Sequence, residues 1–263
     1  MIKLGLNGAS GRMGKRISAL INQDKNCKLV SAIEYPESPD LGKDIGDING
    51  EGSMGVKISH ELDTTAECLI DFSQPNSTIK MAQVCQKNKI AFVTGTTGLN
   101  DAQLKELKDL SEQIPILIGS NMSIGVNLLF RFASQIAKAL GDDYDIEIIE
   151  KHHRFKKDAP SGTALSIAES IAEGIKRDLK EVGIYGREGQ VGERTQKEIA
   201  LHSVRAGDIV GEHTIIYGAL GETIELTHRA HTRDTFASGA IKAGKWLANK
   251  DPGLYTMYDV LNL

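Results

Sequence analysis

A glycine-rich turn close to the start of the chain constrains the fold more than any other feature. Residues 2–7 are short, apolar and alternating, which predicts a β-strand, and the turn Gly8-Ala-Ser-Gly-Arg-Met-Gly14 follows at once. An amphipathic stretch over residues 13–21 predicts a helix, and residues 28–33 predict a second strand that ends at Glu34. This order of strand, glycine turn, helix, strand and acid is typical of a dinucleotide-binding βαβ unit.

Each glycine of the turn has its own expected task. Gly8 permits the tight turn, Gly11 lets the backbone approach a pyrophosphate, and Gly14 allows the helix to pack closely on the strand. Glu34 lies where its carboxylate can accept hydrogen bonds from the hydroxyls of an adenine ribose. The spacing is G-x-x-G-x-x-G instead of the commoner G-x-G-x-x-G, and a turn that needs glycine only for packing is the alternative.

Strand and helix patterns continue to alternate through the first half of the chain. Strands are predicted at residues 66–72, 90–94 and 115–119, with helices at 77–87 and 100–112 between them. This alternation predicts a parallel sheet with helices on both faces, and such sheets bind ligands at the carboxyl ends of their strands.

Two loops after these strands are candidate cofactor contacts. We expect Gly95-Thr96-Thr97 and Gly119-Ser120-Asn121-Met122 to flank the nicotinamide end of a dinucleotide. Ordinary turns are the alternative interpretation of both loops.

A second unusual feature is the cationic stretch Glu150-Lys-His-His-Arg-Phe-Lys-Lys-Asp-Ala-Pro-Ser-Gly-Thr163. Ser161 is a good N-cap for a helix predicted over residues 163–177, so Gly162 and Thr163 present backbone N–H groups at its positive end. Cations beside a helix N-terminus suit a small substrate with more than one carboxylate, and histidine and lysine can donate protons. A solvated loop and a nucleic-acid patch are the alternatives.

The composition narrows these alternatives. The chain has 263 residues, of which 40% are hydrophobic and 25% charged, as in ordinary globular proteins. Its formal net charge of −4 makes the basic stretch local and argues against nucleic-acid binding. Cys27, Cys68 and Cys85 form no metal-binding pattern, and we see no apolar leader or membrane-length run. We therefore expect a cytoplasmic protein with reduced thiols, no metal and no membrane partner.

The pattern changes in the second half of the chain. Residues 126–140 predict a helix and residues 145–150 a strand that leads into the cationic stretch. Three further segments alternate with period two and are separated by Gly/Asp turns at hairpin spacing, namely residues 197–205, 209–217 and 222–230. One face of such a mixed sheet is buried, and the other is covered by water or by a partner. Open sheets of this kind often pair with a second copy of themselves, so we expect an oligomer.

The end of the chain is predicted to pack against the rest. Residues 235–248 predict a final helix, and the apolar tail after Leu254 is expected to dock. Four polar residues lie near a predicted domain boundary, and we interpret them as surface residues in preference to functional ones. They are His228, Arg229, His231 and Arg233.

Taken together, these segments resemble the 4-hydroxy-tetrahydrodipicolinate reductase family, also called dihydrodipicolinate reductases, of the diaminopimelate route to lysine. The resemblance runs nearly end to end, and residues 150–163 are its most specific part, because few families place paired histidines, a lysine and Pro-Ser-Gly-Thr in that order. The other segments that carry it are residues 8–14, Asp71-Phe-Ser73, residues 95–98, residues 121–127 and residues 205–213.

The resemblance implies an α/β fold with two domains. Residues 1–123 and 234–263 would form a Rossmann-type dinucleotide-binding domain, and residues 124–233 an α+β substrate-binding and oligomerisation domain that builds a homotetramer. The implied reaction is the NAD(P)H-dependent reduction of 4-hydroxy-tetrahydrodipicolinate to tetrahydrodipicolinate with loss of water.

The resemblance also implies roles for particular residues. His152 matches the family's acid/base histidine and Lys156 its proton-donating lysine, whereas His153, Gly162 and Thr163 match substrate-binding positions. The implied cofactor-binding residues come from the glycine turn, the acid and the two loops: Gly8, Ala9, Ser10, Gly11, Arg12, Met13, Glu34, Gly95, Thr96, Thr97, Gly119, Ser120, Asn121 and Met122.

Three positions depart from the family pattern. Tyr35 and Gln74 stand where arginines are found, and Met122 replaces a phenylalanine near the nicotinamide. Arginine at position 35 would pair with the 2′-phosphate of NADPH, which tyrosine cannot do as a cation, so NADH is the expected cofactor and NADPH the alternative. Another two-domain nicotinamide dehydrogenase of amino or keto acids, and a non-enzymatic NADH-binding redox sensor, are the alternatives for the whole chain.

Overall fold

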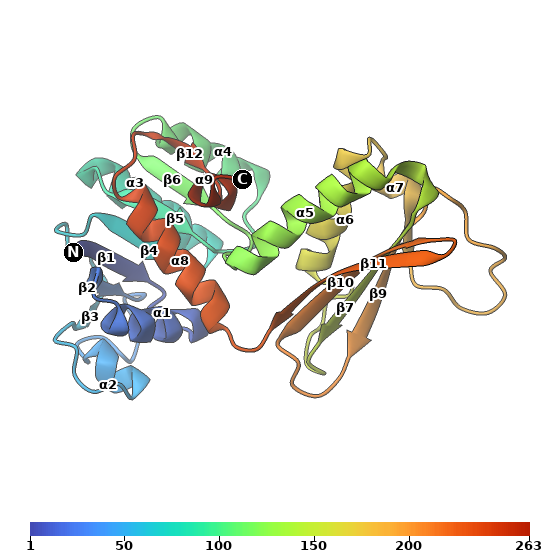
Figure 1. Ribbon diagram of the computed structural model, residues 1–263. Coiled ribbons are helices and arrows are strands. Elements are labelled where there is room, and N and C mark those ends of the chain that lie inside the picture. The colour runs from blue at the N-terminus through green and yellow to red at the C-terminus, as the bar shows by residue number, and fades with distance from the viewer. The chain divides into compact units, whose positions relative to one another are not determined.

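A computed structural model describes all 263 residues and divides the chain into two compact units (Figure 1). Unit 1 comprises Met1–Ile124 and Arg233–Leu263, and unit 2 comprises Gly125–Thr232. None of the helices combines the length and the apolar character that a membrane crossing requires.

Unit 1 is built on a seven-stranded, wholly parallel sheet in the order β12-β6-β5-β4-β1-β2-β3. Its strands are β1 (Ile2–Asn7), β2 (Cys27–Ile33), β3 (Ile58–Ser59), β4 (Cys68–Asp71), β5 (Ala91–Thr94), β6 (Pro115–Ile118) and β12 (Gly253–Tyr255). The chain builds outward from β1 through β2 and β3, and then in the other direction from β4 onward. The strand order therefore reverses between β1 and β4, where open α/β sheets bind their ligands.

Helices cover both faces of this sheet, as the alternating pattern predicts. Helices α1 (Arg12–Gln23) and α8 (Asp234–Leu247) share one hydrophobic core with the sheet. Helix α3 (Pro75–Asn88) contributes Met81 and Cys85 to a second core, and α4 (Asp101–Ser111) contributes Leu107. The central strands are buried on both sides, which explains their nearly continuous apolar sequences. A short helix, α2 (Ile45–Asn49), follows β2.

The tail of the chain docks onto unit 1, as expected. Strand β12 pairs in parallel with β6, and the short helix α9 (Met257–Leu261) packs against α8. The rings of Trp246 and Tyr255 meet edge to face at 5.3 Å, and the Lys250 ammonium lies 4.3 Å from the Trp246 ring. These contacts make the last residues part of the fold.

Unit 2 contains a five-stranded mixed sheet in the order β11-β10-β7-β9-β8. The strands are β7 (Asp145–His152), β8 (Gly183–Tyr185), β9 (Ile199–Arg205), β10 (Gly211–Ala219) and β11 (Glu222–Ala230). Its helices are α5 (Ile124–Leu140), α6 (Gly162–Gly174) and the short α7 (Leu179–Val182), with a 3-10 turn, η1 (Gly141–Asp143). The hydroxyl of Tyr217 on β10 donates to the Ala133 carbonyl of α5 at 2.6 Å, so a buried tyrosine fastens this helix to the sheet.

One expected hairpin is wrong and another is confirmed. Strands β9 and β10 do not pair with each other, because β7 lies between them, parallel to β9 and antiparallel to β10. Alternation predicts which side chains face the core but not which strand lies alongside, and the apolar β7 takes the central place. Strands β10 and β11 do form a hairpin, with Gly221 at φ 100° in its turn.

Most predicted elements occur with small shifts at their ends. Strand β7 continues to His152, two residues past its predicted end, because Glu150 and His152 extend the inward-facing series of Ile146 and Ile148. Helix α6 ends at Gly174 instead of residue 177, and Lys176 beyond it has φ 58°. Sequence patterns missed seven elements of two to five residues each, which is too few to show a period: α2, β3, η1, α7, β8, β12 and α9.

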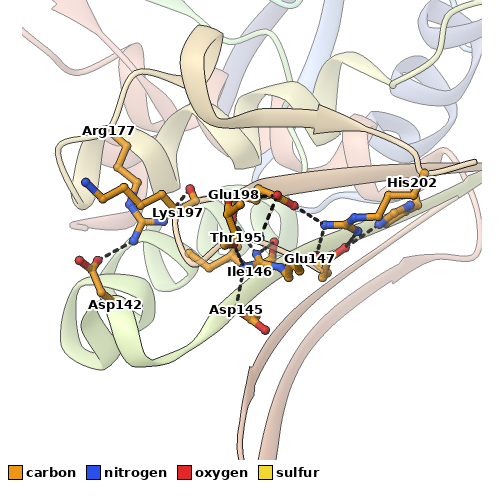
Figure 2. Close-up of polar contacts among 11 residues, drawn as sticks. Asp142, Asp145, Ile146, Glu147, Arg177, Thr195, Lys197, Glu198 and His202 are labelled. Carbon is orange, nitrogen blue, oxygen red and sulfur yellow. Dashed lines mark hydrogen bonds and ion pairs between the residues drawn. The ribbon is translucent and has the colours of Figure 1, made fainter. Parts of the chain in front are cut away.

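The segment between β8 and β9 is held by charged side chains instead of regular structure. Arg187 and Arg194 both donate to the Glu147 carboxylate of β7 at 2.9 Å, and His202 of β9 lies 2.6 Å from it (Figure 2). Burial opposes ionisation of Glu147, but the hydrogen bonds from Arg187, His202 and Arg194 outweigh it and lower its pKa to about 2. This cluster lies on the face of β7 opposite to Ile146 and Ile148.

Candidate active site

The glycine turn of unit 1 has the close contacts that only glycine allows. Gly8 has φ +79°, and a Cβ there would lie 2.4 Å from the Phe72 carbonyl oxygen. A Cβ on Gly14 would lie 2.2 Å from the Gly8 carbonyl oxygen, so the first turn of α1 rests directly on the loop. Gly11 is the N-cap of α1 and offers no side-chain cap. The helix N-terminus is therefore of the kind that binds phosphate groups.

The acid at the end of β2 is fixed against this turn. The backbone N–H of Ser10 donates to Glu34 Oε1 at 2.8 Å, and the N–H groups of Gly8 and Ala9 donate to the Ile33 carbonyl. Glu34 thus lies beside the predicted pyrophosphate loop, where a ribose-binding carboxylate belongs. The following residue, Tyr35, is 58% exposed.

A buried carboxylate organises the point where the strand order reverses. Asp71, the last residue of β4, is completely buried. Its Oδ1 accepts from Asn7 Nδ2 at 2.7 Å and Ser73 Oγ at 2.5 Å. Its Oδ2 accepts from the hydroxyls of Thr78 at 2.7 Å, Thr94 at 2.8 Å and Thr96 at 2.9 Å. These five donors tie together the ends of β1, β4 and β5 and the first turn of α3.

The two predicted nicotinamide loops follow β5 and β6, and their side chains differ in placement. The Thr96 hydroxyl is turned inward to Asp71, and Met122 is buried in the core, whereas Thr97 and Ser120 are exposed. A Cβ on Gly95 would lie 2.4 Å from the Phe72 ring, so this glycine is required by packing. The cofactor-binding roles of both loops stay predictions.

In unit 2 the cationic stretch is organised by Glu150, which is completely buried. Arg205 at the end of β9 donates to both carboxylate oxygens at 2.8 Å. Oε2 also lies 2.6 Å from His152 Nδ1, and Oε1 accepts from the Ser161 backbone N–H at 3.1 Å. One carboxylate therefore joins the predicted acid/base histidine to the start of helix α6.

The charges of this cluster follow from burial and from these contacts. Burial opposes ionisation of Glu150, but hydrogen bonds from Arg205 and His152 outweigh it and lower its pKa to about 2. Burial lowers the pKa of His152 below its usual value, and Glu150 opposes that shift. The ring of His213 on β10 meets the His152 ring edge to face at 5.3 Å. Burial, followed by the neighbouring His152, lowers the pKa of His213 to about 3, so His213 stays neutral.

The N-terminus of α6 is capped as the sequence predicts. Ser161 Oγ accepts from the Ala164 N–H at 3.2 Å and lies 3.2 Å from His213 Nε2. Gly162 and Thr163 begin the helix, and a Cβ on Gly162 would meet nothing within 4 Å. There is open space at this helix end, as a carboxylate site requires.

The other two predicted side chains have local partners. Lys156 Nζ lies 2.9 Å from Asp158 Oδ2 on the loop between β7 and α6. His153 Nδ1 is buried without a hydrogen-bond partner, and its ring lies 6.2 Å from that of Phe155, which is 77% exposed. The structure thus brings His152 and the α6 terminus together through Glu150, while Lys156 and His153 contact other residues of the loop.

Known proteins match the chain from end to end. Residues 2–122 match the family model described as "Dihydrodipicolinate reductase, N-terminus", and residues 125–261 match "Dihydrodipicolinate reductase, C-terminus". The chain belongs to the dihydrodipicolinate reductase family. This confirms the family resemblance, and with it the nicotinamide-dependent type of oxidoreductase and the link to lysine biosynthesis.

Relatives of the dihydrodipicolinate reductase family share much of this sequence. The chain is 45% identical to the 4-hydroxy-tetrahydrodipicolinate reductase of Syntrophus aciditrophicus (strain SB), across 99% of this chain and 98% of the relative. It is 47% identical to the enzyme of that name from Desulfotalea psychrophila, across 100% and 99%. A dipicolinate-bound dihydrodipicolinate reductase from Paenisporosarcina sp. TG-14 is 27% identical and matches with a TM-score of 0.78 over 98% of both chains. The expected α/β architecture is thereby confirmed.

Sequence reasoning missed four residues of these clusters, Asp71, Glu150, Arg205 and His213, as candidates for a role. A signal was present for Glu150, since it lies two residues before His152 and so on the same face of a strand. Asp71 ends an apolar strand, where an acid needs several donors to be buried. Nothing local pointed to Arg205 or His213, which reach the site from other strands.

Proposed function

We infer that this protein reduces 4-hydroxy-tetrahydrodipicolinate to tetrahydrodipicolinate, with loss of water and with hydride from a nicotinamide cofactor, in lysine biosynthesis. The inference depends chiefly on one observation. A full-length sequence identity of 45% to a 4-hydroxy-tetrahydrodipicolinate reductase accompanies the segment from His152 to Thr163, which is organised around a buried carboxylate.

In this proposal unit 1 binds the cofactor across the carboxyl edge of its sheet. The pyrophosphate would rest on residues 8–13 at the start of α1, and Glu34 would accept hydrogen bonds from the adenine ribose. When bound, the nicotinamide supplies the hydride, and the chain orients and shields it. NADH is the preferred form, because neither the exposed Tyr35 nor Gln74 can pair with a 2′-phosphate as a cation.

Unit 2 binds the substrate by its carboxylates in this proposal. The backbone N–H groups of Gly162 and Thr163 and the side chain of His153 would receive them, which also makes the ring a better hydride acceptor. Dipicolinate, which is bound in the Paenisporosarcina structure, is a pyridine ring with two carboxylates, as this arrangement requires.

His152 and Lys156 would handle protons. His152 serves as the acid/base group, held by Glu150 at its Nδ1 edge. Lys156 serves as the proton donor to the reduced ring, and its pairing with Asp158, a residue 60% exposed in its side chain, is of the weak kind that a substrate can replace.

We also propose that unit 2 mediates a homotetramer. The sheet face that carries Ile149 and Ile216 is only half-buried, and Val204 on the same face is exposed. Exposed apolar groups on a sheet face are typical of an interface. A cytoplasmic location is proposed from the three cysteines, which are buried and unpaired, as in reducing compartments.

The test is a coupled assay that generates the cyclic substrate in place and follows NADH absorbance. Wild-type protein should oxidise NADH only when substrate is formed. Its catalytic efficiency should be higher with NADH than with NADPH. A redox sensor would show no substrate-dependent oxidation, and a clear NADPH advantage would refute the cofactor preference.

The same assay tests the proton donor. Lys156→Ala should lower turnover by roughly 10²-fold or more while NADH binding is unchanged, because acid catalysis contributes about that much. Lys157→Ala is the matched control, since Lys157 is an adjacent exposed lysine, and its turnover should stay within about twofold of wild type. Equal turnover of wild type and Lys156→Ala would remove Lys156 from the proposed mechanism.

A further inference from the structure

We propose that Glu150 is a positioning residue for the reaction. Its buried carboxylate holds the Nδ1 edge of His152 and the first residue before helix α6 in one rigid frame. The acid/base group and the carboxylate-binding helix end thereby keep a constant separation. The inference deepens the proposed function and rests on it, because it takes His152 as the acid/base group.

The geometry leaves Glu150 no freedom to move. Oε1 accepts from Ser161 N at 3.1 Å and Arg205 Nη2 at 2.8 Å. Oε2 accepts from Arg205 Nη1 at 2.8 Å and lies 2.6 Å from His152 Nδ1. Four polar contacts from three elements, with complete burial, mean that no water competes for either oxygen.

This contact also decides which nitrogen of His152 can exchange a proton. An ionised carboxylate only accepts hydrogen bonds, so His152 Nδ1 must carry the hydrogen and Nε2 must be the working atom. Position 211 on β10 is next to that atom, and a Cβ on Gly211 would lie 3.2 Å from His152 Nε2. Any side chain at position 211 would therefore crowd Nε2.

Arg205 extends the frame to the loop that carries the lysine. Besides its two bonds to Glu150, its Nη2 donates to the Asp158 carbonyl oxygen at 2.6 Å. Asp158 is also the partner of Lys156. The pair of Glu150 and Arg205 thus fixes His152, the start of α6 and the lysine loop relative to one another.

The chain provides a matched control on the same strand. Glu147 also contacts arginine and histidine side chains, Arg187, Arg194 and His202, at 2.6 to 2.9 Å (Figure 2). It lies on the opposite face of β7 from Glu150 and is bonded to neither His152 nor α6. A general loss of charge on β7 should affect both variants, whereas loss of positioning should affect only the Glu150 variant.

The experiment compares Glu150→Gln with Glu147→Gln in the coupled assay. Glu150→Gln should lower kcat by roughly 10²-fold with NADH affinity unchanged, because the amide no longer fixes one tautomer. The limb of the pH–rate profile that reports His152 should move to lower pH by about one unit, since a negative partner is lost. Glu150→Asp, which keeps the charge, should retain the wild-type limb with an intermediate kcat. Glu147→Gln should match wild type in both readouts.

The outcomes separate this inference from the proposed function. If wild-type protein oxidises no NADH with substrate, the proposed function fails, whatever Glu150 does. If wild type is active and Glu150→Gln keeps its kcat and pH limb, the positioning role is overturned.

If Glu150→Gln does not fold, nitrogen-15 NMR of the wild-type histidines gives the answer, with His152 assigned by the His152→Asn spectrum. A neutral His152 protonated at Nδ1 supports the proposal, and protonation at Nε2 overturns it.

Discussion

Asp71 in unit 1 and Glu150 in unit 2 are both completely buried carboxylates in or at the end of a strand, yet they are stabilised in different ways. Asp71 accepts hydrogen bonds from one amide and four hydroxyls, none of which carries a charge. Glu150 has a guanidinium, an imidazole, the Ser203 hydroxyl and a single backbone N–H as partners, so that charged and titratable groups are among them.

The difference between the two clusters fits different tasks. The amide and hydroxyl donors around Asp71 do not titrate, so its cluster keeps one arrangement over the working pH range. It can serve as a static support for the loops where a dinucleotide is expected. The Glu150 cluster contains His152, a titratable group whose pKa is lowered by burial and held up by Glu150, so the same kind of buried acid can there direct a proton.

The largest expected effect comes from removing the cation beside Glu150. Arg205→Met should lower the free energy of unfolding by about 3–5 kcal/mol, because it leaves a buried charge uncompensated. Urea unfolding measures the change, with Arg187→Met as control, since Glu147 keeps Arg194 as a partner. A loss below about 1 kcal/mol for Arg205→Met would mean that Glu150 depends on its neutral donors, as Asp71 does.

A smaller effect is expected at Asp71. Asp71→Asn keeps the shape but replaces one acceptor oxygen with a donor, which should cost about 1–3 kcal/mol of stability. NADH affinity should fall, because the residue orders the ends of β1, β4 and β5. The pH–rate limb should stay where it is in wild type. If the pH–rate profile of Asp71→Asn were shifted, Asp71 would also affect the titration of the catalytic group, and the proposed difference from Glu150 would be wrong.

The smallest effect concerns pH and stability in unit 2. Burial is the main reason that the pKa of His213 is lowered to about 3. As the pH falls below about 6.5, His213 therefore binds a proton in the unfolded chain but not in the folded chain. Stability contributed by neutral His213 is therefore complete above pH 6.5 and is lost as the pH falls toward 3. Between pH 6.5 and 5.5 the expected loss is about 1 kcal/mol.

This pH effect can be isolated with one variant. His213→Gln should flatten the dependence of unfolding free energy on pH between 5 and 7, although His152 and His228, whose pKa values are also lowered by burial, keep part of it. The contribution of ionised Glu150 to the free energy of unfolding is lost only as the pH falls from about 4.5 toward its pKa of about 2, outside this window. An unchanged slope in the variant would show that His213 takes up its proton equally well in the folded and the unfolded chain.

Much of the molecule followed from its sequence. The turn of residues 8–14 predicted the βαβ unit, and Ser161 predicted the start of α6, because a strand, a turn and a cap depend on neighbours within a few residues. The tail after Leu254 was predicted to dock from its apolar character alone, and it does. The short elements α2 and β3 were not predictable in this way.

Only the tertiary structure decided which groups meet. Glu150 and Arg205 lie 55 positions apart, and Asp71 finds the hydroxyls of Thr94 and Thr96 23 and 25 positions later. Alternation specifies the face on which a side chain lies but not the strand beside it, so the place of β7 between β9 and β10 could not be read from the chain. That strand order is what brings Arg205 from one side and His213 from the other to the cluster around Glu150 and His152, because hydrogen bonds between strands depend on the whole sheet.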